Sequence, residues 1–197
     1  MSSELAQQTQ NAFEFIQKFH IEISYLIKEV EGLLQQEEEG FVIGKPSGYG
    51  VTARTSTGLE PVNVENWVPK TFTVFFLPKS MTESTQGQTK TNITSNLKIL
   101  LLHIELTGKD LKEPRVIYGC VRNISSKNQK VKKFENLMWE FSYNHKKIFT
   151  TLANVDYEDG SCSFSGTFKQ EKLFLIDSSE DVVKKLIEPM LKLYREV

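Results

Sequence analysis

The chain has 197 residues, and 25 acidic side chains almost balance 24 basic ones, so the net charge is −1. This balance argues against a generally basic nucleic-acid-binding protein and against an acidic disordered chain. No wholly apolar run, such as 74–77 or 99–102, is longer than four residues, far short of the ~20 that span a bilayer. Two cysteines without CxxC spacing, and a polar N-terminus unlike a secretory signal, predict a reduced, cytoplasmic protein that does not contact membranes. We expect residues 1–197 to form a single globular domain.

Residues 3–38 have the pattern of one long amphipathic helix. Apolar residues recur at alternating spacings of three and four, which is the a and d seam of a heptad repeat, and no proline interrupts them. The seam consists of Ala12, Ile16, Phe19, Ile23, Leu26, Val30 and Leu33. It is longer than one small sheet needs, so a homodimer through this helix is expected. The candidate dimer contacts are the residues that widen the apolar face, namely Phe13, Phe15, Ile27 and Leu34.

After residue 40 the pattern changes from helical to alternating. Strands are predicted at the short apolar runs 41–43, 72–77, 97–106 and 115–121. Residues 97–106 are apolar on both faces, which is typical of a central strand covered on both sides. We expect the run at 115–121 to pair with this central strand.

Residues 80–96 differ in composition from the segments around them. Eight of these 17 residues are Ser or Thr, and few are apolar. Loops longer than ~12–15 residues are usually functional or disordered. The composition therefore predicts a mobile surface loop over residues 80–96.

The pattern at residues 130–142 fits a helix and also a strand. We predict a helix, with the strand as the alternative. From residue 149 to 168 apolar residues again alternate with others, on both sides of Asp159-Gly160. An Asp-Gly pair between two such runs is a strong signal for a β-hairpin. The short apolar run at 173–176 predicts one more strand.

The chain ends in a predicted helix over residues 178–196. Ser178 or Ser179 is expected to cap its N-terminus, and Pro189 lies inside it and should bend it. Consecutive strands earlier in the chain are linked too tightly for parallel crossovers. The predicted fold is therefore α+β, with a mainly antiparallel sheet of about 6–8 strands covered by the long N-terminal helix and the C-terminal helix.

His103 and Glu105 alternate onto one face of the predicted central strand, where a carboxylate can orient an imidazole for acid–base chemistry. The structural alternative, which the sequence favours, places His103 at the edge of the core and Glu105 in solvent. Cys120 is a third, weaker catalytic candidate, expected to be buried and inert because no pattern supplies a cation to lower its pKa. His20 shows no metal-ligand spacing, and His145 falls in a basic run expected to be solvated. No metal or cofactor is therefore predicted.

Charge is unevenly distributed along the chain. Residues 1–39 carry eight Glu against two Lys, a net −6, whereas residues 122–147 carry seven basic residues against two Glu, a net +5. Basic residues mixed with aromatic ones can hold phosphates while the rings stack on unpaired bases. The candidate nucleic-acid-binding residues are Lys127, Lys130, Lys132, Lys133, Trp139, Lys146 and Lys147. The alternative, favoured by helical apolar spacing, is that the aromatics are core and the lysines face water or pair with the acidic helix.

No complete catalytic set is apparent in the sequence. The function that these patterns favour is a non-catalytic protein-interaction or regulatory module whose partner the sequence does not identify. The first alternative is single-stranded nucleic-acid binding through residues 127–147. The second alternative is a small enzyme that uses His103 and Glu105.

Overall fold

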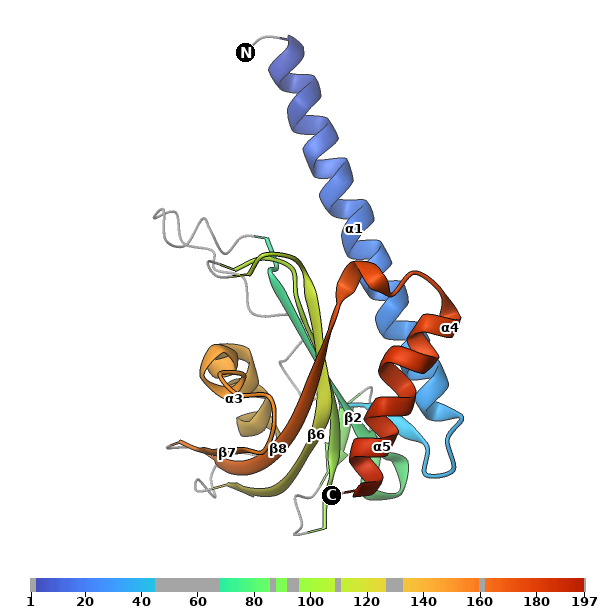
Figure 1. Cartoon of the computed structure of the whole chain (residues 1–197), viewed down its shortest axis with the longest axis vertical. Helices are drawn as coiled ribbons and strands as arrows, with labels where there is room; N and C mark the ends of the chain where they lie inside the picture. The colour runs from blue at the N-terminus through green and yellow to red at the C-terminus, as the bar shows by residue number, and fades with distance from the viewer. Residues whose placement is uncertain are drawn as a thin grey trace.

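The computed structural model describes residues 3–44, 68–85, 88–91, 96–108, 111–126, 133–159 and 162–196. A central β-sheet has helices on both faces (Figure 1). The N-terminal helix and the C-terminal helix cover one face, and a third helix covers the other. Among the described residues, no helix combines the length and the apolar character that crossing a membrane requires.

Six strands form the central sheet in the order β1-β2-β5-β6-β8-β7. They are β1 (Phe41–Ile43), β2 (Thr71–Pro78), β5 (Ile99–Glu105), β6 (Arg115–Ser126), β7 (Val155–Glu158) and β8 (Cys162–Lys172). Every neighbouring pair is antiparallel, and β8 lies between β6 and β7, the two strands that precede it in the chain. The predicted α+β fold with a mainly antiparallel sheet is confirmed.

The central position of β5 follows from its composition. All seven of its residues are buried, as are all eight of β2, because the sheet is covered on both faces. β5 pairs with β6 from Ile99 opposite Val121 to Glu105 opposite Arg115, as expected from the apolar runs. Odd-numbered residues of β5 face one core and even-numbered residues face the other.

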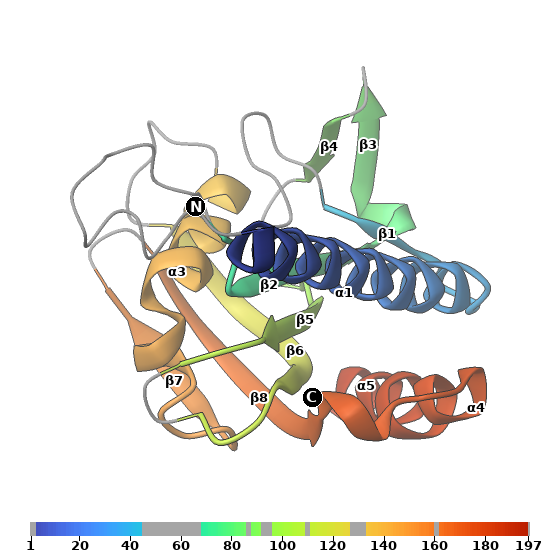
Figure 2. The same ribbon diagram turned by 90° about the horizontal axis from the view of Figure 1, so that it is seen from above.

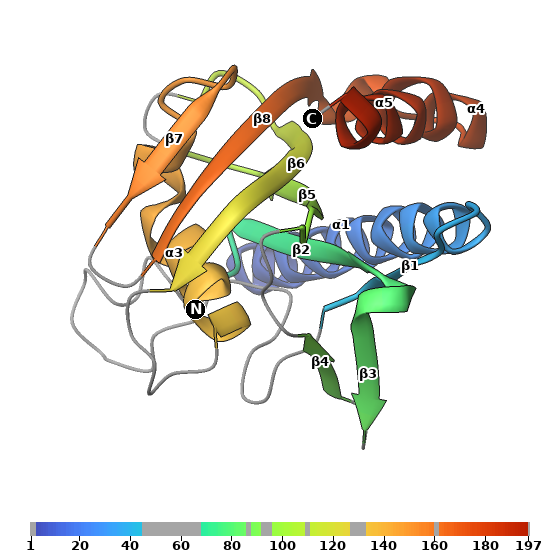
Figure 3. The ribbon, with the colours of Figure 1, turned by 90° about the horizontal axis from the view of Figure 1, so that it is seen from below.

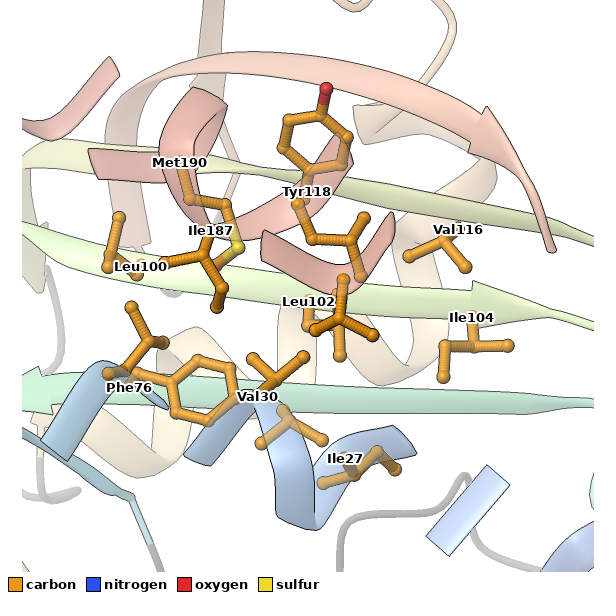
Figure 4. Packing of buried hydrophobic residues seen from close by; sticks show 14 of the residues in the cluster. Ile27, Val30, Phe76, Leu100, Leu102, Ile104, Val116, Tyr118, Ile187 and Met190 are labelled. Carbon is orange, nitrogen blue, oxygen red and sulfur yellow. The ribbon is translucent and has the colours of Figure 1, made fainter. Parts of the chain in front are cut away.

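The first core lies between the sheet and two helices that run side by side (Figures 2 and 3). Helix α1 (Ser3–Gln35) contributes Ile27 and Val30 to it, and the C-terminal helix contributes Ile187 and Met190. Figure 4 shows these side chains meeting the apolar side chains of β2, β5 and β6. The apolar stripe at period 3.6 on α1 therefore covers alternate residues of the strands.

Helix α1 ends earlier than the predicted residue 38. Its last residue is Gln35, and the N–H of Gly40 then donates to the carbonyl of Glu37 at 2.8 Å. Glutamates at a helix C-terminus oppose the helix dipole, which disfavours a further turn. Gly40 has φ +54°, a backbone conformation that glycine adopts without steric cost, so the chain reverses here into β1.

The C-terminal helix is built from three segments, α4 (Ser179–Asp181), the π-helical η3 (Val182–Ile187) and α5 (Glu188–Glu196). The Ser178 hydroxyl accepts from the N–H of Asp181 at 3.2 Å, which confirms a serine cap. Proline lacks an N–H and its ring crowds the carbonyl four residues earlier. The wider π-helical turn before Pro189 relieves that crowding, so the helix continues through the proline.

Helix α3 (Lys133–Ile148) covers the opposite face of the sheet. The helix predicted over residues 130–142 is confirmed against its strand alternative for the described residues 133–142, and it ends six residues later than predicted; residues 130–132 lie outside the described residues. Leu137 and Phe141 are fully buried at helical spacing in this second core. Because α3 extends to Ile148, Phe149 lies in the turn after the helix instead of beginning a strand, and the strand of the predicted hairpin starts at Val155.

Two local predictions are wrong. Residues 80–96 were predicted as a mobile surface loop, but in their described part η1 (Lys79–Met81) is followed by β3 (Thr82–Thr85) and β4 (Gln88–Thr91), which pair as a hairpin that stands away from the main sheet (Figure 2). Residues 86, 87 and 92–95 lie outside the described residues. Threonine is β-branched and favours extended backbone even in a polar segment. The strand predicted at residues 173–176 is instead the short 3₁₀ helix η2 (Leu173–Leu175).

Candidate functional site

A polar cluster lies at the end of β5, on the face of the sheet that α3 covers. His103 and Glu105 alternate onto this face, as predicted, and the antiparallel register places Thr73 of β2 opposite His103. The same register places Arg115 of β6 opposite Glu105. Directly opposed side chains in antiparallel strands have Cβ atoms roughly 4.5–5.5 Å apart. Four polar side chains from three strands are therefore brought together inside an otherwise apolar layer.

His103 is fully buried, with an exposed fraction of 0%. Its Nδ1 lies 2.7 Å from the hydroxyl oxygen of Thr73, and its Nε2 lies 3.4 Å from Oε1 of Glu105. Burial lowers the pKa of His103, although the hydrogen bond and the charge of Glu105 oppose this effect. The imidazole is therefore neutral near pH 7 and can give or accept a proton.

Glu105 is buried, so its predicted place in solvent is wrong. Its Oε2 accepts a hydrogen bond from Nε of Arg115 at 2.6 Å, and Nη1 of Arg115 donates to Gln170 at 2.8 Å. Burial alone would raise the pKa of Glu105, but the hydrogen bonds and charges of His103 and Arg115 outweigh it and lower that pKa to about 2. Arg115 was not among the candidate residues predicted from the sequence. Its positive charge offsets the free-energy cost of burying the ionised carboxylate of Glu105.

His145 also joins the cluster, so its predicted place in a solvated basic run is wrong. It lies in the last turn of α3, where its ring centroid is 5.2 Å from that of His103. The sequence does contain a signal for this position, because His145 follows the buried Phe141 by four residues and precedes the buried Phe149 by four. The charges of the neighbouring lysines obscured that spacing.

A pocket of about 330 Å³ opens beside the cluster. Glu105 and His145 line it, together with Arg115 and Lys146. The arrangement combines a neutral imidazole, an ionised carboxylate and two cations next to a space that a small molecule can enter. These groups can exchange protons or hold a cation, and the pocket gives them access to solvent.

Cys120 does not belong to this site. It lies in the first core, on the opposite face of the sheet from His103, and it is fully buried. Burial raises its pKa to about 12, despite the opposing charges of Lys98 and Arg122, so the thiol is protonated and unreactive. The three weak catalytic candidates of the sequence therefore do not converge, and only His103 and Glu105 are neighbours.

The candidate nucleic-acid-binding residues are only partly described. Lys127, Lys130 and Lys132 lie outside the described residues, and of Lys133 and Trp139 only the backbone within α3 is described. Lys147 lies 3.3 Å from a carboxylate oxygen of Asp159 and 5.4 Å from the ring centroid of Tyr157, so its charge is used within the chain. Lys146 is exposed at the pocket. Because α1 and α3 cover opposite faces of the sheet, the described lysines of α3 do not pair with the acidic helix.

A second candidate site is the N-terminal part of α1, residues 3–16, which we call the arm. It projects beyond the sheet (Figure 1), and every side chain from residue 4 to 15 is exposed. Phe13 and Phe15 are 68% and 69% exposed. Ile27 and Leu34, the other two predicted dimer contacts, are instead buried against the sheet, so they are not available to a partner.

No protein-family model, curated protein or solved structure matches this chain. The function must therefore be inferred from the polar cluster and the arm themselves.

The environment of Glu105 predicts a specific sensitivity to acid. Its pKa is about 2 in the folded protein and near 4.5 without these partners, so its stabilising effect is complete above about pH 5. That effect should be lost as the pH falls from 4.5 towards 2. Urea unfolding across this range should show a falling free energy of unfolding, and Glu105→Gln should flatten that fall.

The matched control for this test is Glu113→Gln. Glu113 forms an exposed ion pair with Lys172 at 2.6 Å, and exposed pairs contribute little to stability. Its acid profile should follow that of the wild type. An unchanged acid profile in Glu105→Gln would show that this carboxylate is not held in its ionised form by the fold.

Proposed function

We propose that the protein is an interaction module that self-associates through the arm, with two copies related by a two-fold axis. The observation that carries this proposal is the exposure of Phe13 and Phe15 on a helix that projects beyond the sheet. Monomeric proteins rarely expose contiguous large apolar patches, and such patches mark interaction sites.

The arm continues the same helix face that the sheet covers further along α1. Ile23 and Val30 of the heptad seam are buried against the sheet, whereas Ala12, on the same seam, is exposed. In the heptad register that makes Ile16 an a position, Phe13 and Phe15 occupy the e and g positions that flank the seam on either side. The arm therefore presents a broad apolar face of the kind that packs against another helix.

The exposure of the arm also favours a partner. Its side chains from residue 4 to 15 are exposed, whereas further along the same helix the ring of Phe19 lies 6.1 Å from that of Phe174. Packing against a second helix would stabilise the arm by burying aromatic surface.

A second copy of the chain is the occupant that fits the charges. The arm contains only two charged residues, Glu4 and Glu14, so it has no basic group to attract an acidic partner. Glu14 projects from the side of the helix opposite to the seam, so two arms can meet without bringing these charges together. An apolar face of this kind is complementary to itself, as a two-fold interface requires.

Sedimentation equilibrium of the full chain tests this proposal. The wild type should sediment as a dimer, and the double variant Phe13→Ala/Phe15→Ala should bind its copy at least about a hundredfold more weakly, because aromatic contacts dominate small interfaces. Alanine preserves helix propensity, so circular dichroism should remain unchanged.

The matched control is Tyr25→Ala. Tyr25 is 63% exposed on the same helix but lies on the side opposite to the seam, so its loss should leave the dimer intact. A wild-type mass of one chain at all practical concentrations, or a double variant that dimerises like the wild type, would refute the proposal.

A further inference from the structure

Three metal-binding side chains converge in the polar cluster. One ligand atom from each of His103, Glu105 and His145 lies within 4.8 Å of the other two. The distance of 3.4 Å between Nε2 of His103 and Oε1 of Glu105 is close to the ~3.3 Å that separates two ligands at ~2.0–2.1 Å from a tetrahedral zinc ion. Small movements of the His145 side chain complete such a set.

The surroundings hold two of these ligands in place. The hydroxyl of Thr73 contacts Nδ1 of His103, and because a hydroxyl both donates and accepts, it can support the tautomer that leaves Nε2 free for a metal. Arg115 binds only Oε2 of Glu105, so Oε1 faces the imidazole. Nε2 of His103 is fully buried and faces Oε1 of Glu105 at 3.4 Å, which is long for a hydrogen bond to a buried nitrogen.

We propose that His103, Glu105 and His145 bind one zinc ion. Two imidazole nitrogens and one carboxylate oxygen are a ligand set of catalytic zinc sites, in which a water molecule takes the fourth position. Glu105 and His145 also line the pocket of about 330 Å³, so water or a small ligand can reach that position from solvent. This site is independent of the arm, because it lies on the opposite face of the sheet from α1.

Histidine and carboxylate ligands fit zinc better than the alternatives among common ions. Calcium and magnesium prefer sites made of oxygen ligands, whereas imidazole suits zinc and its transition-metal neighbours. No cysteine belongs to the cluster, so cobalt substituted for zinc should show no thiolate charge-transfer absorption.

Titration calorimetry of the full chain with zinc chloride, after treatment with a chelator, tests the site. We expect one zinc ion per chain with micromolar or tighter affinity, and a higher melting temperature in its presence. His145→Ala should weaken binding by more than the ~10–100-fold that loss of a supporting hydrogen bond costs. Thr73→Val should weaken it within that ~10–100-fold range, because the valine keeps the shape but not the hydroxyl.

The matched control is His20→Ala. His20 is the one histidine of the chain outside the proposed site, and it lies in α1, which covers the other face of the sheet. The centroid of its ring lies 5.6 Å from that of Phe72. Its loss should leave zinc affinity unchanged, and circular dichroism should establish that each variant is folded. The proposal is overturned if the wild type binds no zinc at micromolar concentrations, or if the folded His145→Ala and Thr73→Val variants bind it as tightly as the wild type.

Discussion

Replacing Phe141 by alanine should lower the free energy of unfolding by roughly 3–5 kcal/mol, because a fully buried aromatic side chain is lost and a cavity remains. The ring of Phe141 lies 5.0 Å from that of Phe164 and 5.3 Å from that of Phe75, measured between centroids. Phe141 therefore joins α3 both to β2 and to β8, which lie on either side of the β5–β6 pair in the sheet. Urea unfolding at pH 7 measures the loss directly.

Lys146→Ala, on the same helix, is the control for this prediction. Lys146 is exposed, and substitutions of exposed residues usually change stability by no more than about 0.5 kcal/mol. A loss below about 1 kcal/mol for Phe141→Ala would mean that α3 does not pack on the sheet as described.

Gly119→Ala should be similarly damaging, although it adds only one methyl group. Gly119 lies opposite Phe168 in the pairing of β6 with β8, and a Cβ at this position would come within 2.6 Å of Cδ1 of the Phe168 ring and closer still to the backbone oxygen of Thr167. The strands would have to separate to accommodate it, so we expect a loss at or above the upper end of the ~1–3 kcal/mol typical of overpacking.

Gly32→Ala makes the same chemical change where there is room for it. No atom lies within 4 Å of a Cβ at Gly32, and alanine is favoured over glycine inside a helix by roughly 0.5–1 kcal/mol. The melting temperature should therefore fall in Gly119→Ala and rise in Gly32→Ala. Equal behaviour would contradict the close approach of β6 and β8 at Gly119.

Elements with a local pattern were predictable from the sequence. The heptad spacing defined α1, and the two-sided apolar run at residues 97–106 identified β5 as the central strand. The ambiguous segment at 130–142 was correctly predicted as helix, because Leu137 and Phe141 follow helical spacing. Local propensity failed within residues 80–96, where the described strands β3 and β4 pair with each other in a small sheet of their own, a pairing that no apolar alternation in the sequence indicates.

The polar cluster was only half predictable. His103 and Glu105 share a strand, so alternation alone places them on one face. His145 and Thr73 reach them through tertiary packing and strand register, which no spacing along the chain encodes. The burial of Glu105 depends on the Arg115 guanidinium from the next strand, which the sequence places ten residues away without giving the pairing. Similarly, the heptad seam is longer than one small sheet needs, which predicted that some of its residues would not pack against the sheet. The position of the sheet, which the seam does not encode, determines which residues these are.

Spin labels on the arm test the central claim, self-association, most directly. Cys120 and Cys162 are both buried, so a cysteine introduced at exposed Ala12 will be labelled selectively. Packed helices lie ~8–10 Å apart and the arm is only ~21 Å long, so two labels should lie within roughly 25 Å of each other. A label at the exposed Lys192 provides the comparison, because it belongs to α5, which lies far from the arm (Figure 1). We predict a short, defined distance between labels at position 12 and a longer one at position 192. No dipolar coupling at position 12, or a shorter distance at position 192, would contradict association through the arm.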